Sequence, residues 1–223
     1  MSLPLVIVPV FNAFEKLEAC LESISRTVPA DTRVLLIDDA STDTRLLPLL
    51  QSWVNDAIPY RRLLVHEVNR GFVATANHGM QMAGTDVVLL NSDTVVTSGW
   101  IQKLKGCLDS DTSIATATPW SNNGEIVSIP KFCASNPIPP DPEAVASVIE
   151  SSGQACYPEM PTAVGFCMAI SSRAISRIGL FDEATFGRGY GEENDFCQRA
   201  EKAGMRNVLC DDAYVVHHVG ASF

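Results

Sequence analysis

The stretch of residues 87–96 constrains the fold of this chain more than any other. Four apolar residues in a row, Val87-Val88-Leu89-Leu90, are followed by the polar residues Asn91-Ser92-Asp93. An apolar run of this length indicates a strand that is buried on both faces, as in the centre of a parallel sheet. Open α/β sheets bind their ligands at the carboxyl ends of their strands. We therefore expect Asp93 to lie at a ligand-binding site.

Strand and helix patterns alternate through the first half of the chain. This alternation implies a parallel sheet with right-handed crossover connections. Two predicted strands end in acidic loops, at Asp38-Asp39 and at Asp93, and we expect both loops at the same edge of the sheet. The predicted strands are 3–10, 33–37, 63–67 and 87–90, and apolar residues at helical spacing predict helices at 15–26, 46–53, 69–84 and 100–108.

The pattern loosens in the second half. Proline and polar residues make 122–142 an extended excursion. We predict a single α/β domain over residues 1–223, with a mostly parallel central sheet, helices on both faces and a small antiparallel C-terminal portion. An ending at Phe223 without a polar tail is consistent with a domain of a longer protein. Further strands are predicted at 113–118, 162–171, 206–210 and 214–218, and helices at 142–152, 173–178 and 192–203.

Composition and charge exclude several classes of function. With 46% hydrophobic and 19% charged residues, the chain resembles an ordinary globular protein. A formal net charge of −10 disfavours a basic surface, so we expect no nucleic-acid partner. The seven cysteines show no CxxC spacing, which favours reduced cytoplasmic thiols over a zinc site or a disulfide framework. We recognise neither a signal peptide nor a membrane-spanning run, and therefore expect a cytoplasmic protein.

Several short motifs follow one another along the chain, and each is weak by itself. They are Pro9-Val10-Phe11-Asn12, Asp38-Asp39-Ala40-Ser41-Thr42-Asp43, Asn69-Arg70-Gly71-Phe72, Asn91-Ser92-Asp93-Thr94, Phe181-Asp182-Glu183, Gly191-Glu192-Glu193-Asn194-Asp195-Phe196 and His217-His218. In this order and at this spacing they make the chain resemble the family 2 glycosyltransferases of the GT-A fold, over essentially its whole length.

This resemblance implies the transfer of a sugar from a nucleotide-diphosphate donor, a UDP- or dTDP-sugar. The acceptor would be a hydroxyl of a glycan, a cell-surface polysaccharide or a lipid-linked saccharide. Inversion at the anomeric carbon and a divalent metal, Mg²⁺ or Mn²⁺, are also implied. Residues 1–110 would form the nucleotide-binding half, and residues 111–223 the acceptor and catalytic half. The sequence leaves open the oligomeric state and an association with the inner face of the membrane.

The predicted nucleotide pocket begins at the turn after the second strand. A carboxylate of Asp38 or Asp39 can accept a hydrogen bond from a nucleobase N–H or a ribose hydroxyl, and the resemblance puts an acidic residue of this turn in that role. The alternative is a cap for the helix of residues 42–50. The other predicted donor-binding residues lie at strand ends and at a helix start, where backbone amides attract phosphate: Pro9, Phe11, Asn12, Asn69, Gly71, Asn77, Asn91 and Ser92.

Asp93 is the predicted metal ligand. Mg²⁺ and Mn²⁺ favour oxygen ligands and need few protein carboxylates when phosphates supply the rest. The family often has Asp-x-Asp here, whereas this chain has Asn91 at the first position, so a second ligand is expected elsewhere. The resemblance points to a histidine at the C-terminal strand, and we favour His217. Adjacent strand residues point to opposite faces, so only one of His217 and His218 can reach the site. The alternative is a structural histidine.

The general base is predicted within the acidic cluster that opens the helix of residues 192–203. Inverting transfer needs a carboxylate that takes the proton of the acceptor hydroxyl. The candidates are Glu192, Glu193 and Asp195, and the resemblance favours Glu193 as the base with Asp195 in support. The alternative is that acidic residues stabilise the helix N-terminus. A glycine-rich loop before this cluster carries Arg188 and Tyr190, which we expect to close over the donor, and Trp120 could line the pocket or pack in the core.

Other functions are less well supported by the residues. A sugar nucleotidyltransferase would need a glycine-rich loop with Lys or Arg after the first strand, and Pro9-Val10-Phe11-Asn12-Ala13 offers neither. A dinucleotide-binding domain would need GxGxxG at the same place. A nucleotide-sugar-binding domain without turnover is supported only by Asn91, and the acidic cluster at 192–195 argues against it.

Overall fold

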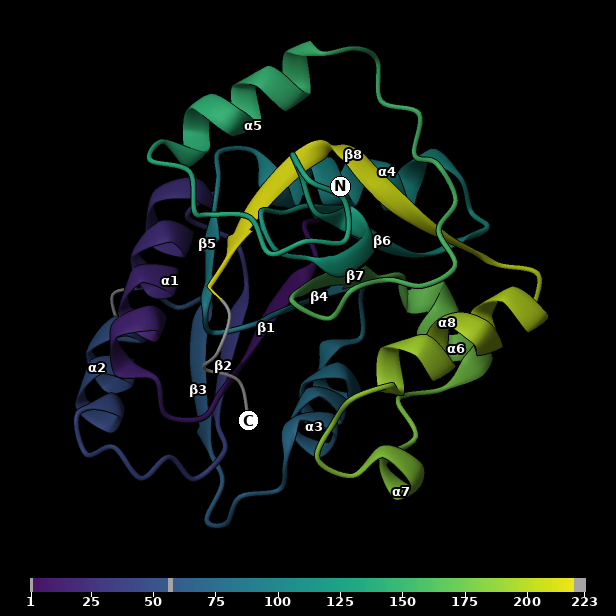
Figure 1. The fold of residues 1–223 in the computed structure, drawn as a ribbon. Coiled ribbons are helices and arrows are strands. Elements are labelled where there is room, and N and C mark those ends of the chain that lie inside the picture. Colours follow the sequence, from purple (N-terminus) through teal and green to yellow (C-terminus); the bar gives the residue numbers. More distant parts are fainter. Residues whose placement is uncertain (1, 56–57, 219–223) are drawn as a thin grey trace.

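The computed structural model describes residues 2–55 and 58–218, and these form one eight-stranded sheet covered by helices (Figure 1). The strands are β1 (Leu5–Val10), β2 (Val34–Asp38), β3 (Arg61–Val65), β4 (Val87–Leu90), β5 (Thr94–Val96), β6 (Ile114–Trp120), β7 (Cys167–Ile170) and β8 (Arg206–His217). The α-helices are α1 (Phe14–Thr27), α2 (Leu46–Trp53), α3 (Phe72–Ala83), α4 (Trp100–Ser110), α5 (Pro142–Ser151), α6 (Ser172–Ile178), α7 (Glu183–Phe186) and α8 (Glu192–Lys202), and η1 (Glu125–Val127) is a 3₁₀ turn.

The strand order is β3-β2-β1-β4-β7-β6-β8-β5. Strands β3, β2, β1, β4, β6 and β8 all run in one direction, whereas β7 and β5 run against their neighbours. The predicted mostly parallel sheet with a small antiparallel portion is therefore confirmed. Because the parallel strands end at one edge, the loops after β1, β2 and β4 and the end of β8 gather there.

Two apolar layers enclose the sheet. Alternate residues of β1 point to opposite faces, so Val6 and Val8 pack under α1, α2 and α4, while Ile7 packs under α3, α6 and α8. Strand β4 contributes to both layers in the same way, which explains its uninterrupted apolar run. Helix α5 packs against Tyr214 and Val216 near the end of β8. None of the helices within the described ranges is long and apolar enough to cross a membrane.

Three sequence predictions about elements need correction. Residues 206–210 and 214–218 were predicted as two strands, but β8 is a single strand of 12 residues with a bulge around Asp211. At this bulge the Asp211 carboxylate accepts the backbone N–H groups of Cys156 and Tyr157, which ties β8 to the segment before β7. The strand predicted at 162–171 shortens to β7, and the tail of the organising stretch forms the separate strand β5.

Gly79 in α3 tests how closely this helix lies on the sheet. A methyl group there would lie 2.6 Å from Cγ2 of Ile7, whereas Gly106 in α4 has no neighbouring atom within 4 Å. We expect Gly79→Ala to lower the free energy of unfolding by about 1–3 kcal/mol through overpacking. Gly106→Ala, the matched control, should raise it by up to about 1 kcal/mol. Chemical denaturation measures both, and equal stability of the two variants would contradict the packing of α3.

Candidate functional site

Asp93 and His217 are brought together by the pairing of β5 with β8. Thr94, the first residue of β5, lies opposite His217 in antiparallel register. The next peptide N–H, that of His218, donates to the Asp93 carbonyl oxygen at 2.9 Å. As a result the Nε2 atom of His217 lies 3.4 Å from Oδ1 of Asp93. The strand register thus places two polar side chains beside each other that are more than a hundred residues apart in the sequence.

Asp93 is buried and the His217 side chain is 17% exposed, but the atoms by which they face each other are buried and lack partners. Within residues 2–55 and 58–218, neither carboxylate oxygen of Asp93 nor Nε2 of His217 has a hydrogen-bond partner. The Nδ1 atom of His217 lies 2.7 Å from the carbonyl oxygen of Asn123. A carbonyl oxygen can only accept, so Nδ1 carries a proton and Nε2 is the ring atom that faces Asp93. A buried carboxylate without a hydrogen-bond partner calls for a positive charge beside it.

This donor set suits a divalent metal held mainly by its substrate. Carboxylate oxygen and imidazole nitrogen are ordinary ligands of Mn²⁺, and carboxylate oxygen is one for Mg²⁺. In the part of the chain that the structure describes, no group of three or more His, Cys, Asp and Glu side chains gathers at one point. Asp93 and His217 would therefore supply two ligands, and a diphosphate could supply others.

The loop that carries Asp93 is fixed on several sides. The Asn91 N–H donates to the Phe166 carbonyl at 2.9 Å, and the Asn91 carbonyl accepts from the Thr94 hydroxyl at 2.8 Å. Ser92 is 7% exposed, so its side chain has little access to solvent. The Phe166 ring stacks on the His217 ring with centroids 5.2 Å apart. Asp93 is thus held in place by backbone contacts that leave its carboxylate unengaged.

A cavity of about 210 Å³ joins this loop to the acidic start of α8. It brings together four predicted site residues, Asn91, Glu192, Glu193 and His217. Arg188, Gly189 and Tyr190 of the glycine-rich loop line one side of it. The full lining is Phe72, Asn91, Glu125, Gly165, Phe166, Arg188, Gly189, Tyr190, Glu192, Glu193 and His217.

The three acidic residues of α8 occupy different surroundings. Glu192 is 5% exposed, and burial raises the pKa of its carboxyl to about 7. Glu193 is only partly buried, and among the described residues one carboxylate oxygen of each glutamate lacks a hydrogen-bond partner. Asp195 does not line the cavity and forms an ion pair with Arg199 at 2.7 Å. Glu192 and Glu193 therefore face the cavity with free acceptor atoms, whereas Asp195 is engaged.

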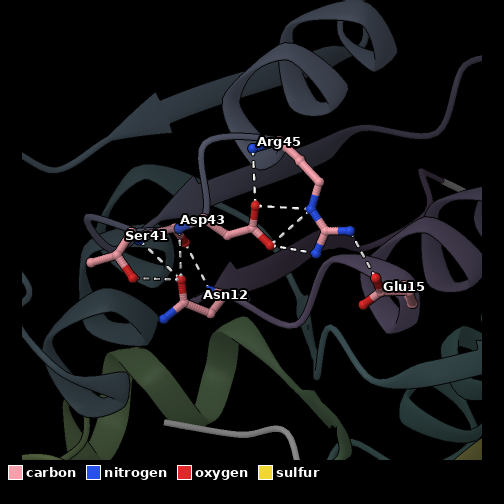
Figure 2. Close-up of polar contacts among 6 residues, drawn as sticks. Asn12, Glu15, Ser41, Asp43 and Arg45 are labelled. Atoms are coloured by element: carbon pink, nitrogen blue, oxygen red, sulfur yellow. Dashed lines mark hydrogen bonds and ion pairs between the residues drawn. The ribbon is translucent and has the colours of Figure 1, made fainter.

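Asn12 organises the turn after β2 (Figure 2). Its side-chain oxygen accepts the backbone N–H groups of Thr42 and Asp43 at 2.9 and 3.1 Å, and its own N–H donates to the Ser41 hydroxyl. Asp43 pairs with Arg45 at 2.7 Å. The guanidinium of Arg45 lowers the pKa of Asp43, and it also contacts Glu15 at 2.8 Å. The loops after β1 and β2 are thus tied into one rigid edge.

Asp38 and Asp39 point in different directions. Asp38 accepts from the Ser41 N–H at 3.1 Å and lines a second cavity, of about 590 Å³, at the ends of β2 and β3. Asp39 is fully buried, and its carboxylate accepts the N–H groups of Arg70 and Gly71 at 2.9 and 2.8 Å. Asp39 therefore binds the turn before α3 and does not cap α2.

Two histidines, His66 and His78, continue the chain of polar contacts that begins at the Asp39 carboxylate. Nδ1 of His66 lies 2.8 Å from Oδ1 of Asp39, and Nε2 of His66 lies 3.0 Å from Nδ1 of His78. Asn69 donates to the Asp39 carbonyl at 3.1 Å. Gly71 has φ of +83°, and an added methyl group would lie 3.0 Å from Cα of Arg188. Only glycine lets the turn before α3 approach the glycine-rich loop this closely.

The remaining predicted donor residues are not brought to the cavity. Asn77 is buried, and its amide both donates to and accepts from the backbone of Phe181, which ties α3 to the segment before α7. Pro9 is buried within β1, and Phe11 is partly buried beside it. Trp120 packs in the core and donates to the Asp211 carbonyl at 3.2 Å, so it does not line the cavity.

Among the residues that line the cavity, Phe72 and Glu125 were not predicted as site residues. Phe72 and Phe166 look like core residues in the sequence, and only the fold shows that they border a cavity. Glu125 has φ of +49°, an unusual backbone conformation for a residue other than glycine. The sequence signal was the run Ser121-Asn122-Asn123-Gly124, which indicates a tight turn but does not reveal what the turn faces.

Residues 5–179 match the family model described as glycosyl transferase family 2. The chain belongs to this family. Its relatives include the uncharacterised glycosyltransferase EpsJ of Bacillus subtilis, 29% identical over 100 residues, and the glycosyltransferase GlyG of Streptococcus pneumoniae, 30% identical over 104 residues.

These relatives are longer than the chain. The alignments cover 44% of this chain in each case, but only 28% of EpsJ and 33% of GlyG. The chain therefore matches a third or less of the length of these relatives. The match identifies a glycosyltransferase family domain and leaves the activity of the whole protein to be proposed.

Solved structures confirm the predicted GT-A fold. GalNAc-T7 with UDP, GalNAc and Mn²⁺ superposes with a TM-score of 0.75 at 17% identity, covering 97% of this chain and 44% of that protein. The mannosyltransferase PcManGT of Pyrobaculum calidifontis with GDP-Man and Mn²⁺ gives 0.70 at 19% identity, covering 99% and 58%. S. aureus TarS with UDP-GlcNAc gives 0.68 at 16% identity, covering 100% and 60%.

The raised pKa of Glu192 predicts how the stability of this glycosyltransferase domain depends on pH. Between the ordinary value of 4.5 and about 7, the unfolded chain has released the proton that the folded chain keeps. The free energy of unfolding therefore falls as pH rises through this window. Glu192→Gln removes this cost and should stabilise the domain by roughly 1–3 kcal/mol at pH 8, with no gain at pH 4.

Denaturation at both pH values measures this effect. Glu201→Gln, an exposed glutamate on the same helix, is the matched control and should show no dependence on pH. A gain from Glu192→Gln that is equal at pH 4 and pH 8 would contradict the burial of an ionisable Glu192.

Proposed function

We propose that the protein transfers a sugar from a nucleotide-diphosphate donor, a UDP- or dTDP-sugar, to a hydroxyl of a glycan or lipid-linked saccharide, with inversion. The observation that carries this proposal is the cavity between His217, which lies against Asp93, and the acidic start of α8. A nucleophile activated on one side and a diphosphate leaving on the other need groups of these two kinds. We also propose that the protein is cytoplasmic and meets lipid-linked acceptors at the inner face of the membrane.

Asp93 and His217 are the residues that would hold Mg²⁺ or Mn²⁺. A bound divalent ion stabilises negative charge on a leaving diphosphate. The solved structures of GalNAc-T7 and PcManGT both contain Mn²⁺ together with nucleotide or nucleotide sugar, which supports the assignment. Asn91 lines the cavity and, as a neutral amide, can donate a hydrogen bond to a phosphate or sugar oxygen.

Glu193 is our proposed general base. It is half-buried and lines the cavity, and one of its carboxylate oxygens has no hydrogen-bond partner among the described residues. Glu192, with its pKa raised to about 7, is partly protonated near neutral pH and can donate a hydrogen bond to a sugar hydroxyl. Asp195 holds Arg199, whose guanidinium also binds the carbonyls of Ile178 and Leu180 at 2.7 and 2.9 Å. We assign Asp195 to positioning α8.

The nucleoside is proposed to lie against the edge formed by the loops after β1, β2 and β3. Asp38 is the candidate there, because its carboxylate accepts only the Ser41 N–H among the residues that the structure describes. Asn12 and Asp39 build this edge by binding neighbouring backbone amides, and Phe11 borders it. Asn69 and Gly71, in the turn before α3, are proposed to shape the approach to the phosphates, because the Gly71 N–H is itself bound by Asp39. Pro9, Asn77 and Ser92 would act by shaping these loops.

A donor-binding domain without turnover is the competing function, because Asn91 replaces a carboxylate. The free carboxylate oxygens of Glu192 and Glu193 in the same cavity favour the enzyme. Transfer or hydrolysis of the donor by the isolated domain would decide between the two.

Metal removal tests the first half of the proposal. Calorimetry with UDP should show tighter binding with Mn²⁺ than with a chelator, and Asp93→Asn should abolish the difference. The reason is that the carboxylate at this position supplies the ion's only anionic protein ligand among the described residues. Asp31→Asn, which removes an exposed carboxylate elsewhere, is the charge-matched control. Metal-dependent binding that survives in Asp93→Asn would overturn the assignment.

The base is tested by a pair of neighbouring variants. Glu193→Gln should keep donor affinity and lose about 10²- to 10⁴-fold in transfer rate, because general base catalysis typically contributes that much. Glu192→Gln should retain most of the rate, since an amide still donates a hydrogen bond. Initial rates with a saccharide acceptor measure both. The opposite ranking would move the base to Glu192.

A further inference from the structure

The loop after β6 makes contacts with His217 that the proposed function has not used. Asn122 is 3% exposed, and its side-chain oxygen accepts the His217 N–H at 2.9 Å. Its side-chain nitrogen donates to the His217 carbonyl at 3.2 Å. The Asn122 carboxamide therefore makes two hydrogen bonds with the backbone of His217. The carbonyl of the next residue, Asn123, accepts from Nδ1 of the same histidine.

The sheet explains why His217 needs such a partner. On one side β8 pairs with β5, and the His218 N–H donates to Asp93 in that direction. Alternate peptide groups of a strand point to opposite neighbours, so the N–H and C=O of His217 point towards β6. The pairing of β6 with β8 ends at Trp120 and Tyr214, three residues before His217. The Asn122 side chain takes the place of the missing strand.

The loop that carries Asn122 is itself firmly fixed. Asn136 is 6% exposed, and its N–H and side-chain amide both donate to the Asn122 carbonyl, at 3.0 and 3.1 Å. The Gly124 N–H donates to the Ser128 hydroxyl at 2.9 Å. An added methyl group on Gly124 would lie 2.8 Å from the Phe166 ring, the ring that stacks on His217. Backbone, glycine and ring together leave the loop little freedom to move.

We infer that Asn122 is a positioning residue for His217. It holds the backbone of His217, while the Asn123 carbonyl keeps the proton on Nδ1, so that the Nε2 lone pair points at Asp93. The inference rests on the proposed function in one respect only, namely that a divalent ion lies between Nε2 and Asp93. Groups that orient a ligating histidine typically change metal affinity by about 10- to 100-fold when removed.

The ring and backbone of His217 can be observed without any metal. Nitrogen NMR of histidine-labelled protein, assigned with His217→Gln, should show the ring protonated at Nδ1 and a slowly exchanging His217 amide. Asn122→Ala should speed that exchange and mix the two ring tautomers. Asn123→Ala removes a side chain that makes no hydrogen bond within residues 2–55 and 58–218 but keeps the carbonyl, so the tautomer and the exchange rate should not change.

A Mn²⁺ titration by electron paramagnetic resonance completes the test. Asn122→Ala and Asn122→Asp should bind the ion about 10- to 100-fold more weakly than the wild type. Asn122→Asp keeps the acceptor for the His217 N–H and replaces the donor amide by a second acceptor, so it serves if Asn122→Ala does not fold. An Nε2-protonated ring or a fast-exchanging amide in the wild type would overturn the inference, as would full Mn²⁺ affinity in a folded variant.

The two proposals fail in different ways. A wild-type protein that binds no Mn²⁺ but whose ring tautomer and amide exchange respond to Asn122→Ala would refute the metal site and support the positioning role. A protein that binds Mn²⁺ through Asp93 equally well with and without Asn122 would support the metal site and refute the positioning role of Asn122.

Discussion

The site depends on one register, the pairing of Thr94 in β5 with His217 in β8. It sets Nε2 of His217 3.4 Å from a carboxylate that has no other partner within the described residues. A shift of one residue would point His217 to the opposite face of the sheet and bring His218 in its place. The short strand β5 is therefore more important for the site than its three residues suggest.

The rest of the fold protects that register and builds the cavity around it. Strand β4 delivers the Asn91–Asp93 loop, which Phe166 and Thr94 fix through backbone contacts. Helix α8 presents Glu192 and Glu193 from the other side. The turn before α3, held by Asp39, approaches the glycine-rich loop at Arg188 and so connects the nucleotide edge to the cavity. The acidic side chains of the site thus lie on loops and helix ends that the packed sheet holds in place.

The sequence predicted those parts of the site that depend on local pattern. The apolar run before Asp93 identified a central strand, and alternation along the last strand predicted that only one of His217 and His218 reaches the site. The same reasoning could not rank Glu192, Glu193 and Asp195, because their difference lies in burial and in a partner, Arg199, rather than in their spacing. Asp39 was expected to serve the donor or to cap a helix, yet its carboxylate binds the turn before α3. Its partners lie 27 to 32 residues away in the sequence.

Long-range contacts account for most of what was missed. Asp211 and Asp212 resemble a turn in the sequence, whereas in the structure they lie within β8 and Asp211 binds two amides of a distant segment. Asn122 resembles an ordinary loop residue, and its partner lies 95 positions further along the chain. The spacing of apolar residues shows which face of its own helix or strand a residue occupies. The roles of Asp211 and Asn122 depend instead on contacts between two separate elements.

The central claim is that a divalent cation lies between Asp93 and His217. Anomalous diffraction from crystals grown with Mn²⁺ and UDP tests it most directly. The account predicts a manganese peak within coordination distance of an Asp93 carboxylate oxygen and of Nε2 of His217. A direct Nε2–H hydrogen bond to Asp93, with manganese absent or located elsewhere, would contradict it.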